Sequence, residues 1–272
     1  MELDEFGLLQ HPNGDIYICG PTESADFPTT PGAVQPYHAG GDAESFVARL
    51  TPDLARLEAS TYLGGSAMDI ASDMILDIDG NICVVGHTAS DDFPVTSNAY
   101  DTTLIPQSWD QFDVFITILT PDLDSIIAST YIGGSHPDYF NQIRVTMDYR
   151  GNIIVAGATI SGDYPVTPNA YMNTGGTNTG PDAFISKLSP DLSTLEASTY
   201  FGGSALEQVL DLRCDQDNSI IICGITGSPN LPTTPTAYIT SLSGDGDGYI
   251  ARLGPDLDTL IASCLLYTSD AA

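Results

Sequence analysis

Apolar residues in this chain fall in short alternating runs that turn residues separate. One such pair, at residues 74–78 and 82–86, flanks the tripeptide Asp-Gly-Asn at residues 79–81. Asp-Gly between two β-prone runs favours a tight hairpin, because the turn needs a positive φ that glycine adopts at little cost. No stretch of ten or more residues shows an apolar period of 3.6, so we expect almost no helix.

A second hairpin follows each first one. In the same part of the chain, runs at residues 114–119 and 125–131 flank Pro-Asp-Leu at residues 121–123, a sequence typical of turns. The segment between the two hairpins is rich in proline and carries Asp-Phe-Pro at residues 92–94. Two hairpins in succession predict a four-stranded antiparallel sheet.

This series of runs recurs four times. Thr-Tyr-x-Gly-Gly-Ser begins at residues 61, 130 and 199, and Pro-Asp-Leu begins at residues 52, 121, 190 and 255. A unit this regular cannot bury its apolar faces alone and stacks on copies of itself. Four-stranded sheets arranged around an axis form a β-propeller, which we predict here; a β-solenoid is the alternative. We assign blade 1 to residues 1–60, blade 2 to 61–129, blade 3 to 130–198 and blade 4 to 199–263.

The last nine residues interrupt the fourth copy. Residues 264–272 stand where Thr-Tyr-x-Gly-Gly-Ser would begin, and they resemble the translation of a sequencing adapter. A divergent natural tail is the alternative. We therefore expect residues 264–272 to be non-native and the chain to be a fragment. An open arc of four blades would expose apolar faces, so we also expect a larger parent ring whose further blades are partners of these four.

The repeated motifs resemble a known family. Thr-Tyr-x-Gly-Gly-Ser, Asp-x-x-Gly-Asn, Gly-x-Thr, Asp-Phe-Pro-x-Thr and Asp-Ala-Phe-Ile-x-Lys-Leu together look like the bacterial β-propeller repeat labelled SBBP, over residues 2–263. The resemblance implies a large, exported or surface-attached bacterial protein, and hence an extracellular or cell-surface location. It implies no shared activity and no shared functional residues.

The net charge of the chain limits the classes of partner that it can bind. Seven basic residues against 36 acidic ones give a net charge of −29, which repels nucleic-acid phosphates. We therefore expect no nucleic-acid binding. No apolar run approaches the roughly 18 residues of a membrane helix, so we expect no membrane span. The acidity suits a secreted protein, a salt-adapted host or a cation binder.

Two acidic segments raise the question of calcium. Asp77 and Asp79 alternate as oxygen ligands do in a calcium loop, but Ile82 replaces the required glycine and Thr88 the closing glutamate. A plain turn is therefore favoured. Asp245 and Asp247 form a second candidate, with a flexible connector as the alternative. The sequence requires no cofactor and leaves weak calcium binding open.

Basic residues and glycines also recur at fixed positions. Arg49, Lys187 and Arg252 share one register, and an acid precedes it at Glu44, Asp113, Asp182 and Asp247. We interpret the cations as ties between neighbouring sheets through carboxylates; a basic ring that faces a ligand is the alternative. We assign a structural role to the paired glycines of the repeated motif, Gly64, Gly65, Gly133, Gly134, Gly202 and Gly203.

Nothing in the sequence marks a catalytic site. Catalytic motifs such as His-Glu-x-x-His and Gly-x-Ser-x-Gly are missing, and no pair among the many carboxylates stands out. The cysteines Cys19, Cys83, Cys214 and Cys223 are interpreted as small buried hydrophobes. We expect the chain not to be an enzyme.

The most variable part of the repeat holds the only tryptophan. Trp109, with Phe112 and Tyr100, could stack on a sugar or a peptide; packing of Trp109 against its own blade is the alternative. We therefore predict a non-catalytic binding or structural module with an unidentified protein or carbohydrate ligand. The alternatives are an accessory propeller of a secreted multidomain enzyme and a calcium-stabilised adhesive array.

Overall fold

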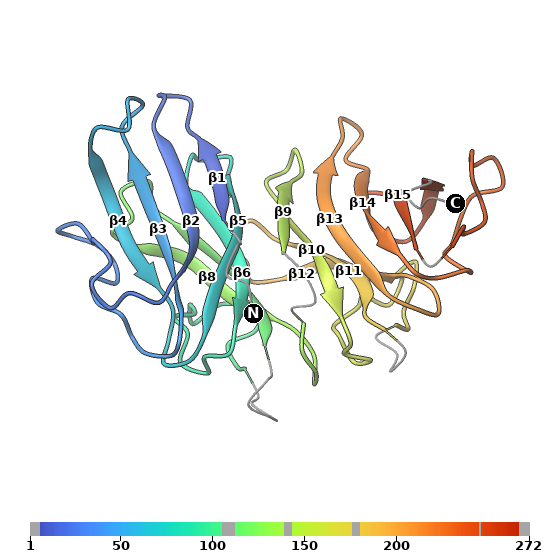
Figure 1. Ribbon diagram of the computed structural model, residues 1–272, viewed down its shortest axis with the longest axis horizontal. Coiled ribbons are helices and arrows are strands. Elements are labelled where there is room, and N and C mark those ends of the chain that lie inside the picture. The colour runs from blue at the N-terminus through green and yellow to red at the C-terminus, as the bar shows by residue number, and fades with distance from the viewer. Residues whose placement is uncertain (1–5, 105–111, 139–142, 176–179, 245, 267–272) are drawn as a thin grey trace. The chain divides into compact units, whose positions relative to one another are not determined.

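The computed structural model describes residues 6–104, 112–138, 143–175, 180–244 and 246–266 (Figure 1). These residues contain sixteen strands and no helix. The strands form four antiparallel sheets of four strands, each in sequence order, as the two hairpins per repeat predict. The protein is therefore all-β, with the repeated four-stranded unit of a propeller blade.

Each sheet is named here by its order along the chain. Sheet 1 comprises β1 (Gly7–Gln10), β2 (Ile16–Thr22), β3 (Glu44–Leu50) and β4 (Leu57–Leu63). Sheet 2 comprises β5 (Asp69–Leu76), β6 (Ile82–Thr88), β7 (Asp113–Leu119) and β8 (Ile126–Ile132). Sheet 3 comprises β9 (Arg144–Met147), β10 (Ile153–Thr159), β11 (Asp182–Leu188) and β12 (Leu195–Phe201). Sheet 4 comprises β13 (Glu207–Cys214), β14 (Ile220–Thr226), β15 (Asp247–Leu253) and β16 (Leu260–Leu266).

The chain divides into two compact units, and each unit contains two sheets. Unit 1 is Met1–Ile132 with Asp191–Ser193, and unit 2 is Gly133–Pro190 with Thr194–Ala272. In unit 1, β5 lies against β1, β2 and β3, and in unit 2, β13 lies against β9, β10 and β11. Each pair of sheets encloses one apolar core, which explains why a single repeat does not suffice for burial.

The Pro-Asp-Leu turn has the same backbone in the copies. Leu54, Leu123 and Leu257 have φ values of 56°, 54° and 55°, in the left-handed region that few residues other than glycine adopt. The N–H of Leu123 closes the turn on the Thr120 carbonyl at 2.9 Å. A β-bulge between the last two residues of β3, β7, β11 and β15 precedes each turn.

The sheets are offset slightly from the assigned blades. Residues 60, 129 and 198, where we end the first three blades, lie inside β4, β8 and β12. Each last strand continues through the Thr-Tyr-x part of the repeated motif, and Gly-Gly-Ser makes the passage to the next sheet. In the fourth copy, Cys264–Leu266 complete β16 at those strand positions, and residues 267–272 lie outside the described part.

Candidate functional site

The tyrosine of the repeated motif fastens the long connector that joins the two hairpins of its own sheet. Its hydroxyl donates to a backbone carbonyl of that connector each time: Tyr62 to Ser24 at 2.7 Å, Tyr131 to Ser90 at 2.8 Å and Tyr200 to Ser161 at 2.7 Å. A buried hydroxyl needs such a partner. The tyrosine is therefore occupied within the fold.

The threonine and serine of the motif are occupied too. Thr61 accepts the N–H of Gln35 at 2.9 Å, and Cys264 accepts that of Ile239 at 3.4 Å in the fourth copy. The serines bind the residue before Phe-Pro, or its equivalent, through their N–H and hydroxyl groups: Ser66 binds Asp92, Ser135 binds Asp163, and Ser204 binds Asn230. Each of these bonds ties a motif serine to a connector within the same compact unit.

The aromatic residue of Asp-Phe-Pro packs on the third strand of its sheet. Phe93 stacks on Phe115 with ring centroids 4.6 Å apart, and Tyr164 stacks on Phe184 at 4.5 Å. All four rings are buried. This aromatic pair holds the first half of the connector down on the sheet, so it contributes to the core and offers no surface to a ligand.

Buried carboxylates meet where one sheet passes to the next. In unit 1 they are Glu44, at the start of β3, and Asp69, at the start of β5; in unit 2 they are Asp182 and Glu207. Side-chain atoms of both members of each pair crowd the place where a Cβ on the first glycine of the motif, Gly64 or Gly202, would stand. The glycine is therefore needed for close approach, whereas its neighbour Gly65 donates its N–H to Asp69 at 2.8 Å.

In unit 1, burial favours the protonated form of both carboxyls. Burial, with a smaller contribution from the nearby charge of Asp69, raises the pKa of Glu44 to about 7. Burial raises the pKa of Asp69 to about 6 and that of Asp138, at the equivalent position in sheet 3, to about 7. A glycosidase pair must reach its substrate. Because Glu44 and Asp69 are fully buried, neither carboxyl is open to a substrate in this structure.

Two of the three recurring cations reach the neighbouring sheet. Arg49 donates to the Pro121 carbonyl at 3.1 Å and pairs with Asp122 at 3.0 Å. Lys187 donates to the Pro255 carbonyl at 2.6 Å, with the Asp256 carboxylate at 3.6 Å. Asp122 and Asp256 both belong to a Pro-Asp-Leu turn, and Arg49 has in addition the Asp15 carboxylate of its own sheet at 3.9 Å.

The third cation is placed differently. Arg252 pairs with Asp215 at 2.5 Å and Asp217 at 3.3 Å, both in the β13–β14 hairpin of its own sheet. The recurring acid register is occupied elsewhere: Glu44 contributes to a buried pair, and Asp247 accepts the N–H of Ser243 at 2.8 Å. Sequence reasoning found the shared register of the cations and missed the turn as their partner. The constant spacing of Pro-Asp-Leu was the available signal.

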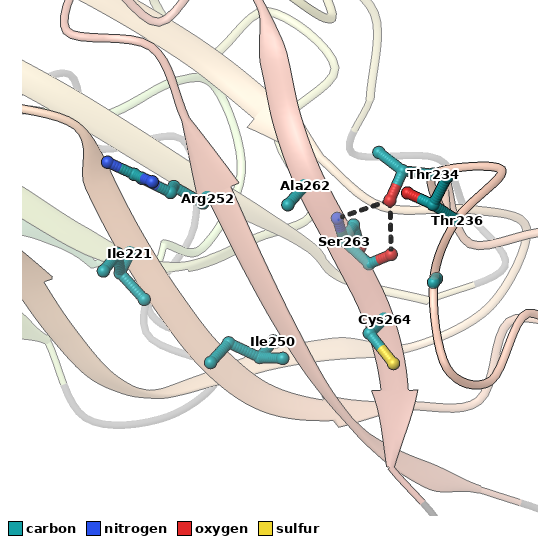
Figure 2. A pocket seen from close by; sticks show the side chains of 9 residues that line it. Ile221, Thr234, Thr236, Ile250, Arg252, Ala262, Ser263 and Cys264 are labelled. Carbon is teal, nitrogen blue, oxygen red and sulfur yellow. Dashed lines mark hydrogen bonds between the residues drawn. The ribbon is translucent and has the colours of Figure 1, made fainter.

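A pocket of about 280 Å³ lies on the face of sheet 4 beside Arg252. Figure 2 shows Ile221, Ile250 and Arg252 on the sheet, with Thr234 and Thr236 of the connector on the other side. Thr234 exchanges hydrogen bonds with the backbone of Ser263, which fixes that connector to β16. The pocket is mainly apolar, with one cation at its end.

The two candidate calcium sites lie in different sheets, one in the β5–β6 turn and the other at the start of β15. Both carboxylate oxygens of Asp77 accept hydrogen bonds within the turn, from the N–H groups of Asp79 and Asn81 and from the Asn81 side chain, each at 2.8 Å. Asp247 is buried at the start of β15, and Asp245 lies outside the described residues. Among the residues that the structure describes, no group of three or more His, Cys, Asp and Glu side chains is placed to hold a metal ion.

The aromatic candidates are only partly placed. Trp109 lies outside the described residues. Phe112 is 8% exposed, and its ring contacts His87 edge-on at 5.4 Å, so little of the ring faces solvent. Tyr100 is half-buried, and burial raises the pKa of its hydroxyl. The structure therefore places Phe112 in the core and leaves part of Tyr100 accessible.

The remaining predicted features concern cysteines and membrane spans. Cys19 and Cys83 are buried and free, and burial raises the pKa of the Cys19 thiol to about 12, so the thiol stays protonated. Within the described ranges, none of the elements is a helix long and apolar enough to cross a membrane.

Comparisons with known proteins give a fold and no family. No protein-family model matches the chain, and no curated protein matches it. The SBBP resemblance thus stays a prediction from the motifs. Among solved structures, a protein of unknown function from Dyadobacter fermentans DSM 18053 superposes with a TM-score of 0.55 at 14% identity. The match covers 97% of this chain and 64% of that one, so this chain spans less than two thirds of its length.

Two further solved structures superpose less well. A protein of unknown function from Bacteroides caccae gives a TM-score of 0.44 at 9% identity, over 96% of this chain and 68% of that one. A thermostable family-43 glycoside hydrolase also gives 0.44, at 10% identity, over 98% and 72%. Sequence identities this low support a similarity of fold alone. The chain has an all-β propeller fold built from four-stranded antiparallel blades.

Proposed function

We propose that the chain is a non-catalytic propeller module, which binds a ligand or supports other domains in an exported or cell-surface bacterial protein. One observation carries this proposal: the recurring polar side chains serve to fasten the blades. The motif tyrosines bind connector carbonyls, the motif serines bind the next connector, and the acid pairs are buried between sheets. The recurring polar side chains thus stabilise the packing of the blades, whereas the connectors differ from one copy to the next.

The connectors between the second and third strands are the best surface for recognition. They cover residues 23–43, 89–112, 160–181 and 227–246 and differ in length and sequence between copies. Tyr37 in the first connector is 81% exposed. Variable loops on a rigid scaffold are where binding sites are usually built, and exposed aromatic rings suit sugars and peptides. The motif resemblance and the high negative charge support an exported, soluble setting.

Binding and turnover can be tested together. The purified chain is applied to glycan and peptide arrays and, in parallel, to a panel of polysaccharides in which released reducing ends are measured. We expect retention on a defined class of ligand without release of product. In the connector at residues 89–112, Trp109→Ala is expected to weaken that binding roughly tenfold.

The matched control is an exposed aromatic residue away from the connectors. Tyr149→Ala, in the β9–β10 hairpin, is expected to leave binding unchanged, since Tyr149 is exposed but lies outside these connectors. Product release that a carboxylate substitution abolishes would overturn the non-catalytic assignment. Equal binding by wild type and Trp109→Ala would remove that connector as the ligand site.

A further inference from the structure

The Pro-Asp-Leu turn of one sheet plugs into the face of the sheet before it. In unit 1, Leu123 is fully buried, and its carbonyl accepts the N–H of Val34 at 3.0 Å. The Pro121 carbonyl beside it accepts from the Tyr17 hydroxyl at 2.9 Å and from Arg49 at 3.1 Å. The face of sheet 1 that receives the turn thus supplies an apolar environment for the leucine, a backbone N–H donor and a cation.

Unit 2 repeats this arrangement with different residues. Leu257 is fully buried, and its carbonyl accepts the N–H of Tyr171 at 2.8 Å. Lys187 donates to the Pro255 carbonyl at 2.6 Å. Since Val34 and Tyr171 share one register, as do Arg49 and Lys187, the contact follows from the repeat and is no accident of one copy. We call the receiving face the socket and the turn the plug.

The socket of sheet 4 lies open. Its cation is Arg252 and its backbone donor is the N–H of Tyr238, whose side chain is 91% exposed. Ile250 is 41% exposed, whereas Val47 and Ile185 at the same register are fully buried under the next sheet. The pocket of Figure 2, with a volume of about 280 Å³, occupies this socket.

The chain also carries an open plug. Leu54 is 62% exposed, yet its φ of 56° matches that of the buried Leu123 and Leu257. Its N–H closes the turn on the Thr51 carbonyl at 2.8 Å, so the turn is already formed before anything covers it. On the same sheet Leu8 is 73% exposed, whereas Met74 at its register is almost fully buried.

We propose that two copies of this chain associate head to tail, with the Pro52–Leu54 turn of one copy inserted in the sheet 4 socket of the other. Arg252 then binds the Pro52 carbonyl and the Asp53 carboxylate, and the N–H of Tyr238 donates to the Leu54 carbonyl. The contact continues the interface that each unit already contains between its own two sheets. It does not depend on the ligand of the connectors, because it concerns the packing of one blade on another.

A second copy is the occupant that the surface fits best. The same chain presents both halves, a preformed apolar plug and an apolar socket, and exposed apolar surfaces of this kind mark interaction sites. Asp53 and Arg252 have opposite charges at positions that pair in unit 1 and unit 2. Such a contact is heterologous, so it generates closed rings or open filaments. Two copies closed on each other contain eight blades, within the known range for propellers.

The test uses complementary variants of the whole chain. Leu54→Asp keeps the socket and loses the plug, while Ile250→Asp keeps the plug and loses the socket. Sedimentation velocity at high micromolar concentration, in salt that screens the repulsion between two copies of charge −29, measures association. We expect the wild type to form dimers or longer assemblies, each variant alone to be monomeric, and their mixture to stop at a one-to-one dimer.

A matched control and a local readout complete the test. Ile127→Asp places the same charge on an exposed apolar residue of β8 and is expected to associate as the wild type does. In the mixture, hydrogen exchange at the Tyr238 amide should slow only in the copy that keeps its socket. A monomeric wild type at the highest concentration overturns the proposal. So does association that survives in either variant alone, or a protected Tyr238 amide in a monomer, which would mean that the socket is filled from within the chain.

Discussion

Lys187 in sheet 3 and Arg252 in sheet 4 occupy the same register, yet they bind different things. Lys187 reaches the Pro255 carbonyl of the following sheet, and only 9% of its side chain is exposed. Arg252 turns to Asp215 and Asp217 of its own sheet, and 36% of its side chain is exposed. The repeat therefore fixes the position of the cation, and the turn of the following sheet, where it is present, supplies its partner. In the open socket, the cation binds the nearest carboxylates of its own sheet.

The apolar residues of the two sockets differ in the same way. Ile185 of sheet 3 is fully buried, whereas Ile250 of sheet 4 remains partly exposed. Full burial of such a side chain contributes about 1.5–3 kcal/mol relative to an exposed one. The covered socket thus contributes to the stability of unit 2, and the open socket retains stabilisation that only a partner can supply.

The largest expected loss of stability comes from a substitution at the junction between the two sheets of unit 2. In Gly202→Ala, the new Cβ would collide with Asp182 and come within 2.6 Å of a Glu207 carboxylate oxygen. Moving two buried carboxylates costs their hydrogen bonds, so we expect unfolding free energy to fall by about 3 kcal/mol. Urea denaturation measures it. Gly246→Ala is the control, because its nearest neighbour, the Thr226 carbonyl, lies 3.3 Å away. Equal loss in both variants would contradict the close-approach argument.

The next effect compares the two cations directly. Lys187→Met removes a charged donor whose side chain is only 9% exposed and leaves the Pro255 carbonyl without that bond, so we expect a loss of about 2 kcal/mol. Arg252→Met removes a solvent-accessible pair and should cost less than about 0.5 kcal/mol. Thermal melts of both variants give the two values. Similar losses of stability in the two variants would contradict the proposed difference between the covered and the open socket.

How far the sequence predicts this fold can be seen at particular residues. The four-stranded antiparallel repeat is confirmed, because alternation and turn residues are local signals. The strand predicted at residues 82–86 is β6, which extends to Thr88. The passage between sheets was harder to predict: Tyr62 and Leu63 belong to β4, since the chain leaves the sheet only at Gly-Gly-Ser.

The site was less predictable because its contacts join distant residues. Glu44 and Asp69 meet across two sheets; the recurring acid register marks Glu44, but no local pattern pairs it with Asp69. The shared register of Arg49 and Lys187 was visible, but the partner turn depends on how sheets pack, which no local pattern contains. Phe112 was predicted as a ligand contact and packs on His87, because an aromatic residue in a variable loop fits core and surface alike.

The acid pair at the covered junction of unit 1 makes stability depend on pH. The folded pKa of Glu44 is about 7 and that of Asp69 is about 6, both above the unfolded values near 4. Their contribution is therefore complete below about pH 4 and is lost as the pH rises through 6 to 7. We expect the free energy of unfolding to fall by about 1 to 2 kcal/mol between pH 6 and pH 7.

Three variants assign that slope. Glu44→Gln keeps a neutral side chain at the junction and should flatten the slope, while Glu58→Gln removes the same charge at the surface and should leave it unchanged. His38 lies 3.3 Å from the Glu44 carboxylate, so His38→Gln tests the contribution of the imidazole. A slope that persists in Glu44→Gln and disappears in His38→Gln would place the titration on the histidine.

Calcium gives the smallest expected effect and separates turn from metal loop. Because both oxygens of Asp77 already accept hydrogen bonds within the β5–β6 turn, the ion would have to displace those bonds in order to bind. We therefore expect millimolar calcium to raise the melting temperature by less than about 1 °C relative to a chelator. Asp77→Asn should melt with the same calcium response as the wild type. A larger shift that Asp77→Asn abolishes would mean that the hairpin exchanges its own hydrogen bonds for the ion, and that the repeats form a calcium-stabilised array.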